Sequence, residues 1–257
     1  MNHKIAVLMT CHNRCNKTLV CLRSLWRSIE DAKDVEATVF LVDDGSTDGT
    51  AASVSKEFPE VHLLKGDGTL YWARGMHMSW ECAVSINVDW DGYLWLNDDI
   101  ELDRNALSRT MGRTKDNPNN IIVGALRDRA SGCTVYGIAD NGLFTGSFVF
   151  IPRIVYQKIG VLSNLYKHAW ADYDYCMKCK RAGISYCSIS STVGVVESHP
   201  LRPSLKALSL VERWRMLSNP KGWCLSDLWT YRIRNFGFFS AVLSCIHMVV
   251  HVLVARE

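Results

Sequence analysis

The sequence has little excess of charge of either sign. Its 29 Lys and Arg residues nearly balance 26 Asp and Glu residues, which leaves a formal net charge of +3 at pH 7. So close a balance gives the surface no general attraction for nucleic acid, and we expect no nucleic-acid partner. The basic residues are unevenly placed, however, and a cluster in the last quarter suits an anionic lipid surface. That cluster comprises Lys206, Arg213, Arg215, Lys221, Arg232 and Arg234.

The N-terminus lacks the long apolar core of a secretory signal peptide, because polar residues soon follow the run from Ile5 to Met9. We therefore expect a cytoplasmic protein. The ten Cys residues also lack the spacing of a small disulfide-stabilised scaffold, so we expect reduced thiols. The one CxxC pair, Cys176 and Cys179, falls inside a predicted helix without two further ligands at matching spacing. Buried thiols are a better interpretation of this pair than a zinc or redox site.

The first 200 residues contain no internal repeat, low-complexity tract or linker. We expect one main domain over residues 1–205, followed by a helical segment over residues 206–257 that is first basic and then apolar. Continuous apolar runs predict strands buried on both faces, at residues 5–9, 37–42, 61–64 and 92–96, with later strands at 123–125 and 143–152. Intervening stretches predict helices, at residues 18–29 and 76–84. This alternation predicts an α/β fold with an open, mostly parallel sheet flanked by helices.

Polar loops follow the predicted strands, at residues 10–14, 43–44, 66–74 and 97–99. In an open parallel sheet these loops converge on one crevice at the carboxyl ends of the strands, where ligands bind. In the last loop, Asp98 and Asp99 follow a buried strand, and adjacent carboxylates repel unless a cation lies between them. The cation we expect is Mg²⁺ or Mn²⁺ holding substrate phosphates. The alternative for such a pair is a turn or the cap of the next helix.

The segment from Phe236 to Ala255 carries no Asp, Glu, Lys or Arg. It predicts a mostly apolar helix that either lies in a membrane interface or packs against a partner. A narrow polar stripe runs down one side of it at helical spacing: Ser240, Ser244, His247 and His251. The two His residues are four apart and could formally bind a metal together. Their place in the stripe favours a simple polar face.

Five motifs in order resemble the family-two glycosyltransferases of the GT-A fold: TCHNR, LVDDGSTDGT, GTLYWARG, LWLNDDIEL and ADYDYCMKCKRAG. The resemblance covers about residues 4–200. It implies a metal-dependent, inverting transfer of a sugar from a UDP- or dTDP-sugar to a lipid-linked or growing glycan, at the inner face of the cell membrane. The LYWARG and LWLNDD motifs are similar to the rhamnosyltransferase-like branch, which builds bacterial surface polysaccharides such as lipopolysaccharide and capsule. Whether the protein forms a homo-oligomer is left open by the sequence.

The resemblance also implies roles for individual residues. The implied nucleotide-sugar site comprises Thr10, His12, Arg14, Asp43, Asp44, Gly68, Arg74, Asn97 and Asp98. The implied metal ligands are Asp99 and the late His199. Asp172 matches the catalytic base of the family, which usually follows a Glu. Because Ala171 stands in place of that Glu, either Asp172 or Asp174 could be the base. Helix capping is a structural alternative for both aspartates.

Two other functions are compatible with a metal-binding α/β fold. A sugar nucleotidyltransferase would need a glycine-rich phosphate loop directly after the first strand, and TCHNRCNK contains no glycine. A non-catalytic nucleotide-binding partner of another glycosyltransferase is favoured by two departures from the family pattern, Asn97 and Ala171.

Overall fold

The structure is a computed structural model that describes residues 3–197 and 205–254. The strands of its main sheet are β1 (His3–Cys11), β2 (Val35–Asp43), β3 (His62–Lys65), β4 (Gly92–Leu96), β6 (Ile121–Val123), β9 (Phe148–Pro152) and β10 (Tyr186–Ser188). Their spatial order is β10-β6-β9-β4-β1-β2-β3. Neighbouring pairs are parallel except the two that involve β9. The expected mostly parallel sheet is confirmed. The antiparallel direction of β9 was not predicted from the sequence.

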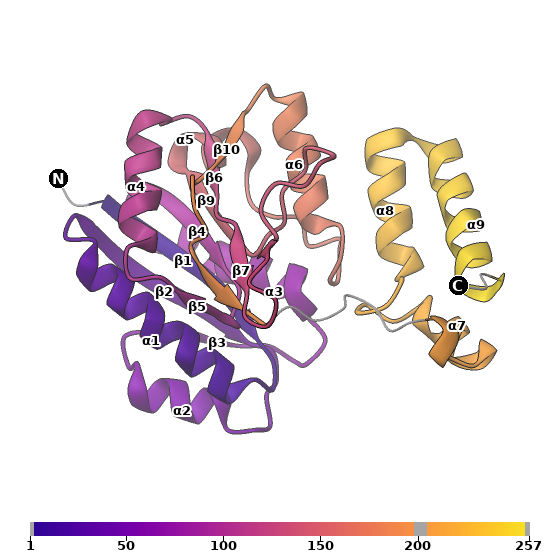
Figure 1. The fold of residues 1–257 in the computed structure, drawn as a ribbon, viewed down its shortest axis with the longest axis horizontal. Coiled ribbons are helices and arrows are strands. Elements are labelled where there is room, and N and C mark those ends of the chain that lie inside the picture. The colour runs from indigo at the N-terminus through magenta and orange to yellow at the C-terminus, as the bar shows by residue number, and fades with distance from the viewer. Residues whose placement is uncertain (1–2, 198–204, 255–257) are drawn as a thin grey trace.

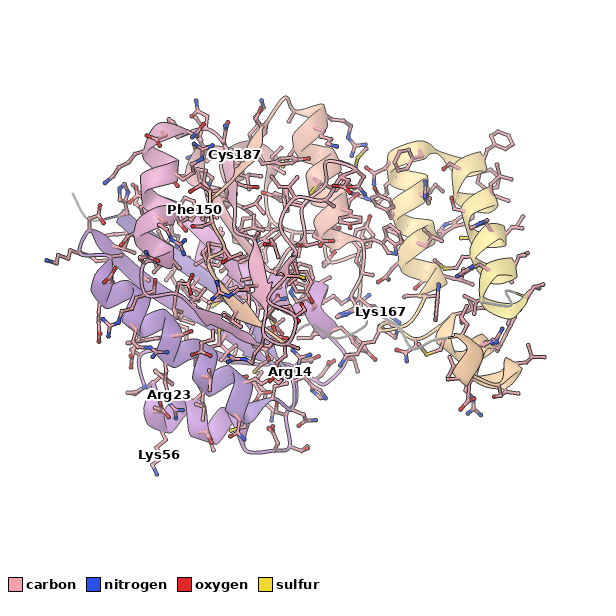
Figure 2. The ribbon with its side chains drawn as sticks, viewed as in Figure 1. Arg14, Arg23, Lys56, Phe150, Lys167 and Cys187 are labelled. Atoms are coloured by element: carbon pink, nitrogen blue, oxygen red, sulfur yellow. The ribbon has the colours of Figure 1, made fainter. Side chains whose placement is uncertain are left out.

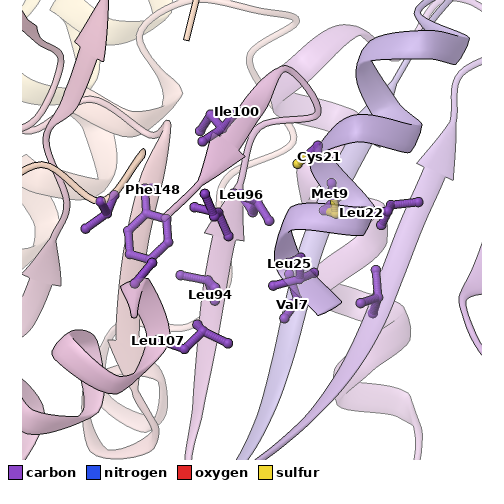
Figure 3. Close-up of a cluster of buried hydrophobic side chains, with 14 of the residues drawn as sticks. Val7, Met9, Cys21, Leu22, Leu25, Leu94, Leu96, Ile100, Leu107 and Phe148 are labelled. Carbon is purple, nitrogen blue, oxygen red and sulfur yellow. The ribbon is translucent and has the colours of Figure 1, made fainter. Parts of the chain in front are cut away.

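Helices cover both faces of this sheet (Figure 1). One face is covered by α1 (Cys15–Asp31), α2 (Thr50–Glu57) and α4 (Ala106–Asp116), and the other by α3 (Tyr71–Ser85), α5 (Arg153–Ile159) and α6 (Ala171–Arg181). Successive side chains of a strand point to opposite faces. Val7 of β1 accordingly packs in one buried cluster with Leu25 and Leu107 (Figure 3), whereas Leu8 belongs to the other cluster with Trp80. Burial on both sides explains the uninterrupted apolar sequence of β1.

A second, smaller sheet packs beside the first. Its strands are β5 (Ile100–Leu102), β11 (Gly194–Val196), β7 (Leu126–Asp128) and β8 (Thr134–Val135), in that spatial order. Strand β5 begins directly after Asp99 and pairs antiparallel with β11. The backbone N–H of Asn97 also donates to the carbonyl of Ser147 at 3.0 Å. The loop of residues 97–99 is therefore fixed at both ends, by β4 and by β5.

Helix α3 begins earlier than the sequence indicated. We expected a loop through Arg74 and a helix from Met76, but the helix starts at Tyr71. The carboxylate of Asp44 supplies the reason, because it accepts backbone N–H groups of Gly68 at 2.8 Å and Tyr71 at 2.9 Å. These bonds satisfy donors that a helix start leaves free. Arg74 consequently lies on the first turn of α3 instead of in a loop.

Two other boundaries differ from the expectation. The strand predicted over residues 143–152 is confined to β9, because the preceding residues pair only through one isolated bridge, between Ile138 and Phe144. The helix predicted from Phe236 begins at Phe238 instead, because Gly237, whose φ of 85° lies in the left-handed region that suits glycine, interrupts the helical backbone. This interruption separates α8 (Leu225–Phe236) from α9 (Phe238–Val254).

The C-terminal helices stand beside the α/β body, with α8 facing α6 (Figure 1). They are preceded by η1 (Leu205–Ala207) and α7 (Leu210–Met216). Within residues 3–197 and 205–254, no helix combines the length and the apolar character that crossing a bilayer requires. All ten Cys residues are free thiols, and Cys176 and Cys179 are both buried in α6, as expected.

Candidate functional site

The cation between the paired carboxylates is Arg14. It follows β1 at the carboxyl end of the sheet (Figure 2). Its Nη1 lies 3.1 Å from Oδ1 of Asp98 and 2.8 Å from Oδ2 of Asp99. The loops after β1 and β4 therefore converge, as parallel strands require. The cation that we expected from the sequence was a metal, and the structure brings a guanidinium to the same place.

Asp98 and Asp99 have different surroundings although they are adjacent. The side chain of Asp98 is 7% exposed, whereas that of Asp99 is 18% exposed. Burial raises the pKa of Asp98 to about 6, while Arg14 opposes the rise and Asp99 adds to it. The hydroxyl of Thr18 donates to Oδ2 of Asp98 at 3.4 Å. Asp99 is thus the more accessible carboxylate of the two.

The DDGS loop after β2 is held by its own carboxylates. Asp43 accepts the backbone N–H of Ser46 at 2.9 Å, and Asp44 accepts the N–H groups at the start of α3. Gly45 and Gly68 meet where these loops cross, because a Cβ on Gly45 would lie 3.0 Å from the backbone nitrogen of Gly68. Asp44 therefore joins the loop after β2 to the loop before α3. Its role in nucleotide binding stays a prediction.

The remaining residues of the implied nucleotide site lie around these loops. His12 Nδ1 is 2.5 Å from the backbone oxygen of Asp44. Thr10 packs against Gly75 of α3 so closely that a Cβ there would lie 2.3 Å from its hydroxyl oxygen. Arg74 precedes Gly75 on the same helix, and its Nε donates to the carbonyl of Asn164, in the segment between α5 and α6, at 3.2 Å. His199 lies outside the described residues.

Asp172 lies in the first turn of α6. Its Oδ2 accepts the backbone N–H of Gly146 at 3.1 Å, and its Oδ1 accepts that of Tyr173 at 2.9 Å. Burial raises the pKa of Asp172 to about 6. No ion pair joins it to a cationic side chain in the described part of the chain. A carboxylate in this state can take a proton near neutral pH.

Trp72 connects Asp172 to the loop after β4. Its indole N–H donates to Oδ1 of Asn97 at 2.9 Å. The other edge of the indole covers Gly146, where an added Cβ would lie 2.5 Å from Cη2 of Trp72 and 3.4 Å from Cβ of Asp172. The acidic loop and Asp172 therefore lie next to the same indole, that of Trp72.

Asp174 points elsewhere, although it is only two residues from Asp172. It is fully buried, and its Oδ1 accepts Nδ2 of Asn235 at 2.8 Å and faces Nε of Arg234 at 3.5 Å. Both partners belong to α8. The structure therefore separates the two aspartates that the sequence left open, since one faces Gly146 and the other holds a C-terminal helix.

The comparison with protein families identifies the family of this chain. A model described as glycosyl transferase family 2 matches residues 6–171, which is more than half of the chain. The chain belongs to glycosyl transferase family 2. This glycosyltransferase has a GT-A-like α/β fold, and its activity is the transfer of a sugar from a nucleotide-sugar donor. No curated protein sequence matches it.

Solved structures share the fold at low sequence identity. Residues 1–349 of TarS from S. aureus match with a TM-score of 0.60 and 12% identity, over 98% of this chain and 81% of that one. A mannosyltransferase from Pyrobaculum calidifontis, PcManGT, was solved with GDP-Man and Mn²⁺ and matches with a TM-score of 0.61 and 15% identity, over 99% of this chain and 71% of that one. TarS 1–349 in complex with UDP-GlcNAc matches with a TM-score of 0.60 and 11% identity, over 97% and 81%.

In this glycosyltransferase, the chain segment that leads to Asp172 is held between α3 and α8. On one side, the backbone N–H of Ala73 donates to the carbonyl of Lys167 at 3.0 Å. On the other, Oδ2 of Asp227 accepts the N–H groups of Lys167 and His168, each at 3.1 Å. Figure 2 shows Lys167 between the body and the C-terminal helices. Two aromatic rings stack at the end of this segment, those of Trp170 and Tyr231, with centroids 5.0 Å apart.

The acidic loop fits a divalent cation that also binds phosphate. Two carboxylates, those of Asp98 and Asp99, lie together at its end, and both are hard oxygen ligands of the kind that Mg²⁺ and Mn²⁺ prefer. In the part of the chain that the structure describes, no three His, Cys, Asp or Glu side chains form a metal-binding group. A cation here would complete its coordination with substrate oxygens, as Mg²⁺ commonly does.

Sequence reasoning did not assign three residues of this site. Trp72 lies in the LYWARG motif, but nothing in the sequence says that its indole faces Asn97. Asp227 and Tyr231 are far along the chain in a segment that we interpreted as a membrane or partner helix. The only sequence signal is Asp227 itself, which is an isolated acid at a helix start.

Proposed function

We propose that this glycosyltransferase moves a sugar from a UDP- or dTDP-sugar to a lipid-linked or growing glycan of a bacterial surface polysaccharide, with inversion. The observation that carries the proposal is the state of Asp172. This carboxylate is partly buried, has a pKa raised to about 6, and lies beside Trp72, whose indole donates to Asn97 of the acidic loop. A general base works best when its pKa lies near the working pH.

In the proposed reaction, Asp172 accepts the proton of the acceptor hydroxyl while the hydroxyl oxygen attacks the anomeric carbon. The bond from that carbon to the diphosphate breaks on the opposite face, so the configuration inverts and no protein nucleophile is needed. The N–H groups of Gly146 and Tyr173 hold the carboxylate in place. We assign this role to Asp172 instead of Asp174, because the side-chain partners of Asp174 lie on α8.

The nucleotide would be held on the other wall. We assign the base and ribose to the loops that carry Thr10, His12 and Asp43, and the phosphates to the region of Arg14 and Arg74. Asp99, as the more exposed carboxylate, would hold Mn²⁺ or Mg²⁺ together with Asp98, and the bound cation would stabilise the charge of the leaving diphosphate. His199 is a further proposed ligand.

A surface on the C-terminal helices supports a membrane location. Five apolar side chains of α9 project outward at helical spacing: Phe239, Leu243, Ile246, Val250 and Val254. Phe239 is 82% exposed, and Trp214 of α7 is 63% exposed. Contiguous apolar surface of this kind marks an interaction site. The basic cluster lies on the same helical segment, so we commit to an anionic phospholipid surface as the partner.

The test of the activity is turnover of nucleotide-sugars. The purified protein is incubated with UDP-GlcNAc, GDP-mannose and dTDP-rhamnose, each with Mn²⁺ and with Mn²⁺ plus EDTA, and release of the nucleoside diphosphate is measured. We expect release from UDP-GlcNAc or dTDP-rhamnose, and its loss with EDTA. Release from GDP-mannose alone would refute the proposed UDP- or dTDP-sugar donor. If none of the compounds binds or reacts, the proposed function is wrong. Release that EDTA does not affect would refute the metal-dependent part alone.

A further inference from the structure

The backbone of Trp170 has a left-handed conformation directly before the helix that carries Asp172. Its φ is 70°. A residue with a Cβ disfavours this region, because the Cβ comes too close to the following carbonyl oxygen. Trp170 is also the N-cap residue of α6, and its carbonyl accepts the backbone N–H of Asp174 at 2.8 Å. The strained backbone of Trp170 therefore sets the direction in which the first turn of α6 begins.

Ring contacts hold the indole of Trp170 in place. It stacks on Tyr231, with centroids 5.0 Å apart and planes at 23°, and it meets Tyr173 edge-on with centroids 5.9 Å apart. Its Nε1 is buried and has no hydrogen-bond partner among residues 3–197 and 205–254. Tyr173 lies on α6 itself and moves with it, so it cannot anchor the indole to another element. Tyr231 can, because it lies on α8.

Tyr231 is well placed to act as that anchor. Its side chain is only 3% exposed. Asp227 stands four residues earlier on α8, on the same face of the helix, and accepts the backbone N–H groups of Lys167 and His168. One face of α8 thus holds the segment before α6 twice, by the carboxylate of Asp227 on its backbone and by the ring of Tyr231 on Trp170. A strained conformation persists only where the surroundings fix it in this way.

We propose that Tyr231 is a positioning residue for Asp172 and acts through Trp170. The inference rests on the proposed function, because it takes Asp172 as the base. Without the ring of Tyr231, the backbone of Trp170 is free to relax from its left-handed conformation, which turns the first turn of α6. The carboxylate of Asp172 then leaves the N–H of Gly146, which it now accepts at 3.1 Å. The C-terminal helices accordingly serve the reaction itself, and not only the proposed contact with lipid.

Three variants on α8 test the inference. Tyr231→Leu removes the stacked ring and keeps an apolar side chain, whereas Tyr231→Phe removes only the hydroxyl and keeps the stack. Trp229→Leu is the matched control, because it deletes another aromatic ring of α8, which meets Phe238 with centroids 5.9 Å apart instead of Trp170. Release of the nucleoside diphosphate from UDP-GlcNAc, GDP-mannose or dTDP-rhamnose gives kcat per folded molecule. Hydrogen exchange at the amide of Gly146 reports the contact with Asp172 independently of turnover.

The expected result for Tyr231→Leu is a loss of chemistry without a loss of nucleotide binding. Its kcat should fall roughly ten- to a hundredfold, because a small misplacement of a reacting group costs about that much. Calorimetry should show that the affinity for the nucleoside diphosphate changes by less than about twofold. Exchange at Gly146 should accelerate by about tenfold or more. Tyr231→Phe and Trp229→Leu should match the wild type in all three measurements.

Several outcomes overturn the inference and leave the proposed function intact. These are a normal kcat in folded Tyr231→Leu, exchange at Gly146 that does not accelerate there, and equal losses of kcat in Tyr231→Leu and Trp229→Leu. A wild type that releases no nucleoside diphosphate overturns the proposed function, and exchange at Gly146 still decides whether Tyr231 holds the carboxylate. If Tyr231→Leu does not fold, Trp170→Leu removes the same stack from the other ring and takes its place.

Discussion

The guanidinium of Arg14 donates to the carboxylate of Asp99 across 2.8 Å, although 85 residues separate the two in the chain. The same nitrogen lies 3.1 Å from Asp98. In the absence of a metal, this one positive charge offsets the repulsion between two adjacent carboxylates. A divalent cation that binds the same oxygens must therefore compete with Arg14.

Replacing Arg14 by Ala should strengthen the binding of Mn²⁺ to the nucleotide-free protein. The removed ion pair is partly exposed, so the gain is about two- to tenfold in affinity. Electron paramagnetic resonance of free Mn²⁺ measures it directly. Arg23→Ala is the matched control, because Arg23 pairs with Glu57 on α2, away from the crevice. Unchanged or weaker Mn²⁺ binding in Arg14→Ala would show that the acidic loop is not the metal site.

Replacing Asp172 by Asn should abolish chemistry and spare binding. Loss of a general base lowers kcat by roughly a hundred- to ten-thousandfold, and nucleotide affinity should change little. In the wild type, kcat/KM should fall as the pH drops below about 6, because Asp172, with its pKa raised to about 6 by burial, then becomes protonated and cannot act as a base. The low-pH limb should disappear in the variant. Titration calorimetry and a pH–rate profile separate the two effects.

Asp174→Asn serves as the comparison for that experiment. It keeps the basicity of Asp172 but weakens the contacts to Arg234 and Asn235, so we expect a lower melting temperature and nearly normal turnover per folded molecule. A selective rate loss in Asp174→Asn with normal turnover in Asp172→Asn would move the base by two residues.

Replacing Asp227 by Ala should loosen the segment that leads to Asp172. One oxygen of Asp227 accepts both backbone N–H groups, so Asn can present its amide oxygen in the same place. We expect Asp227→Ala to destabilise the protein by about 1–3 kcal/mol and Asp227→Asn to restore most of this. Hydrogen exchange at the amides of Lys167 and His168 should accelerate in Asp227→Ala only. Equal exchange in all three proteins would mean that α8 does not hold this segment.

Placing a charge on the exposed face of α9 should weaken membrane binding. Leu243→Glu and Ile246→Glu each put a carboxylate on the outward apolar surface, where it is repelled by anionic lipid. Sedimentation with vesicles that contain phosphatidylserine should fall in both variants, and wild-type binding should fall at high salt. Ile154→Glu, on the exposed side of α5, is the control. If the wild type does not sediment but forms dimers that Leu243→Glu disrupts, the face binds a second copy instead.

The sequence by itself determined the sheet and the place of the site. Apolar runs such as Ile5 to Met9 predict strands buried on both faces, and parallel strands bring the loops at their carboxyl ends together. That argument located Arg14, Asp43 and Asp99 on one edge without any knowledge of contacts. The same argument did not predict the early start of α3, because the carboxylate that accepts the first N–H of that helix belongs to Asp44, on a different loop.

The different surroundings of Asp172 and Asp174, on which the proposed base assignment rests, are decided by the tertiary structure. Both stand in the first turn of α6, and residues two apart on a helix point about 200° apart, so the two side chains must face different neighbours. Local sequence fixes that angle but not the rotation of the helix. The rotation is set by packing of α6 against the sheet and against α8, whose Asn235 is 61 residues away from Asp174. The orientation of Asn97 by Trp72 is decided in the same way, by a contact between α3 and the loop after β4 that the local sequence does not predict.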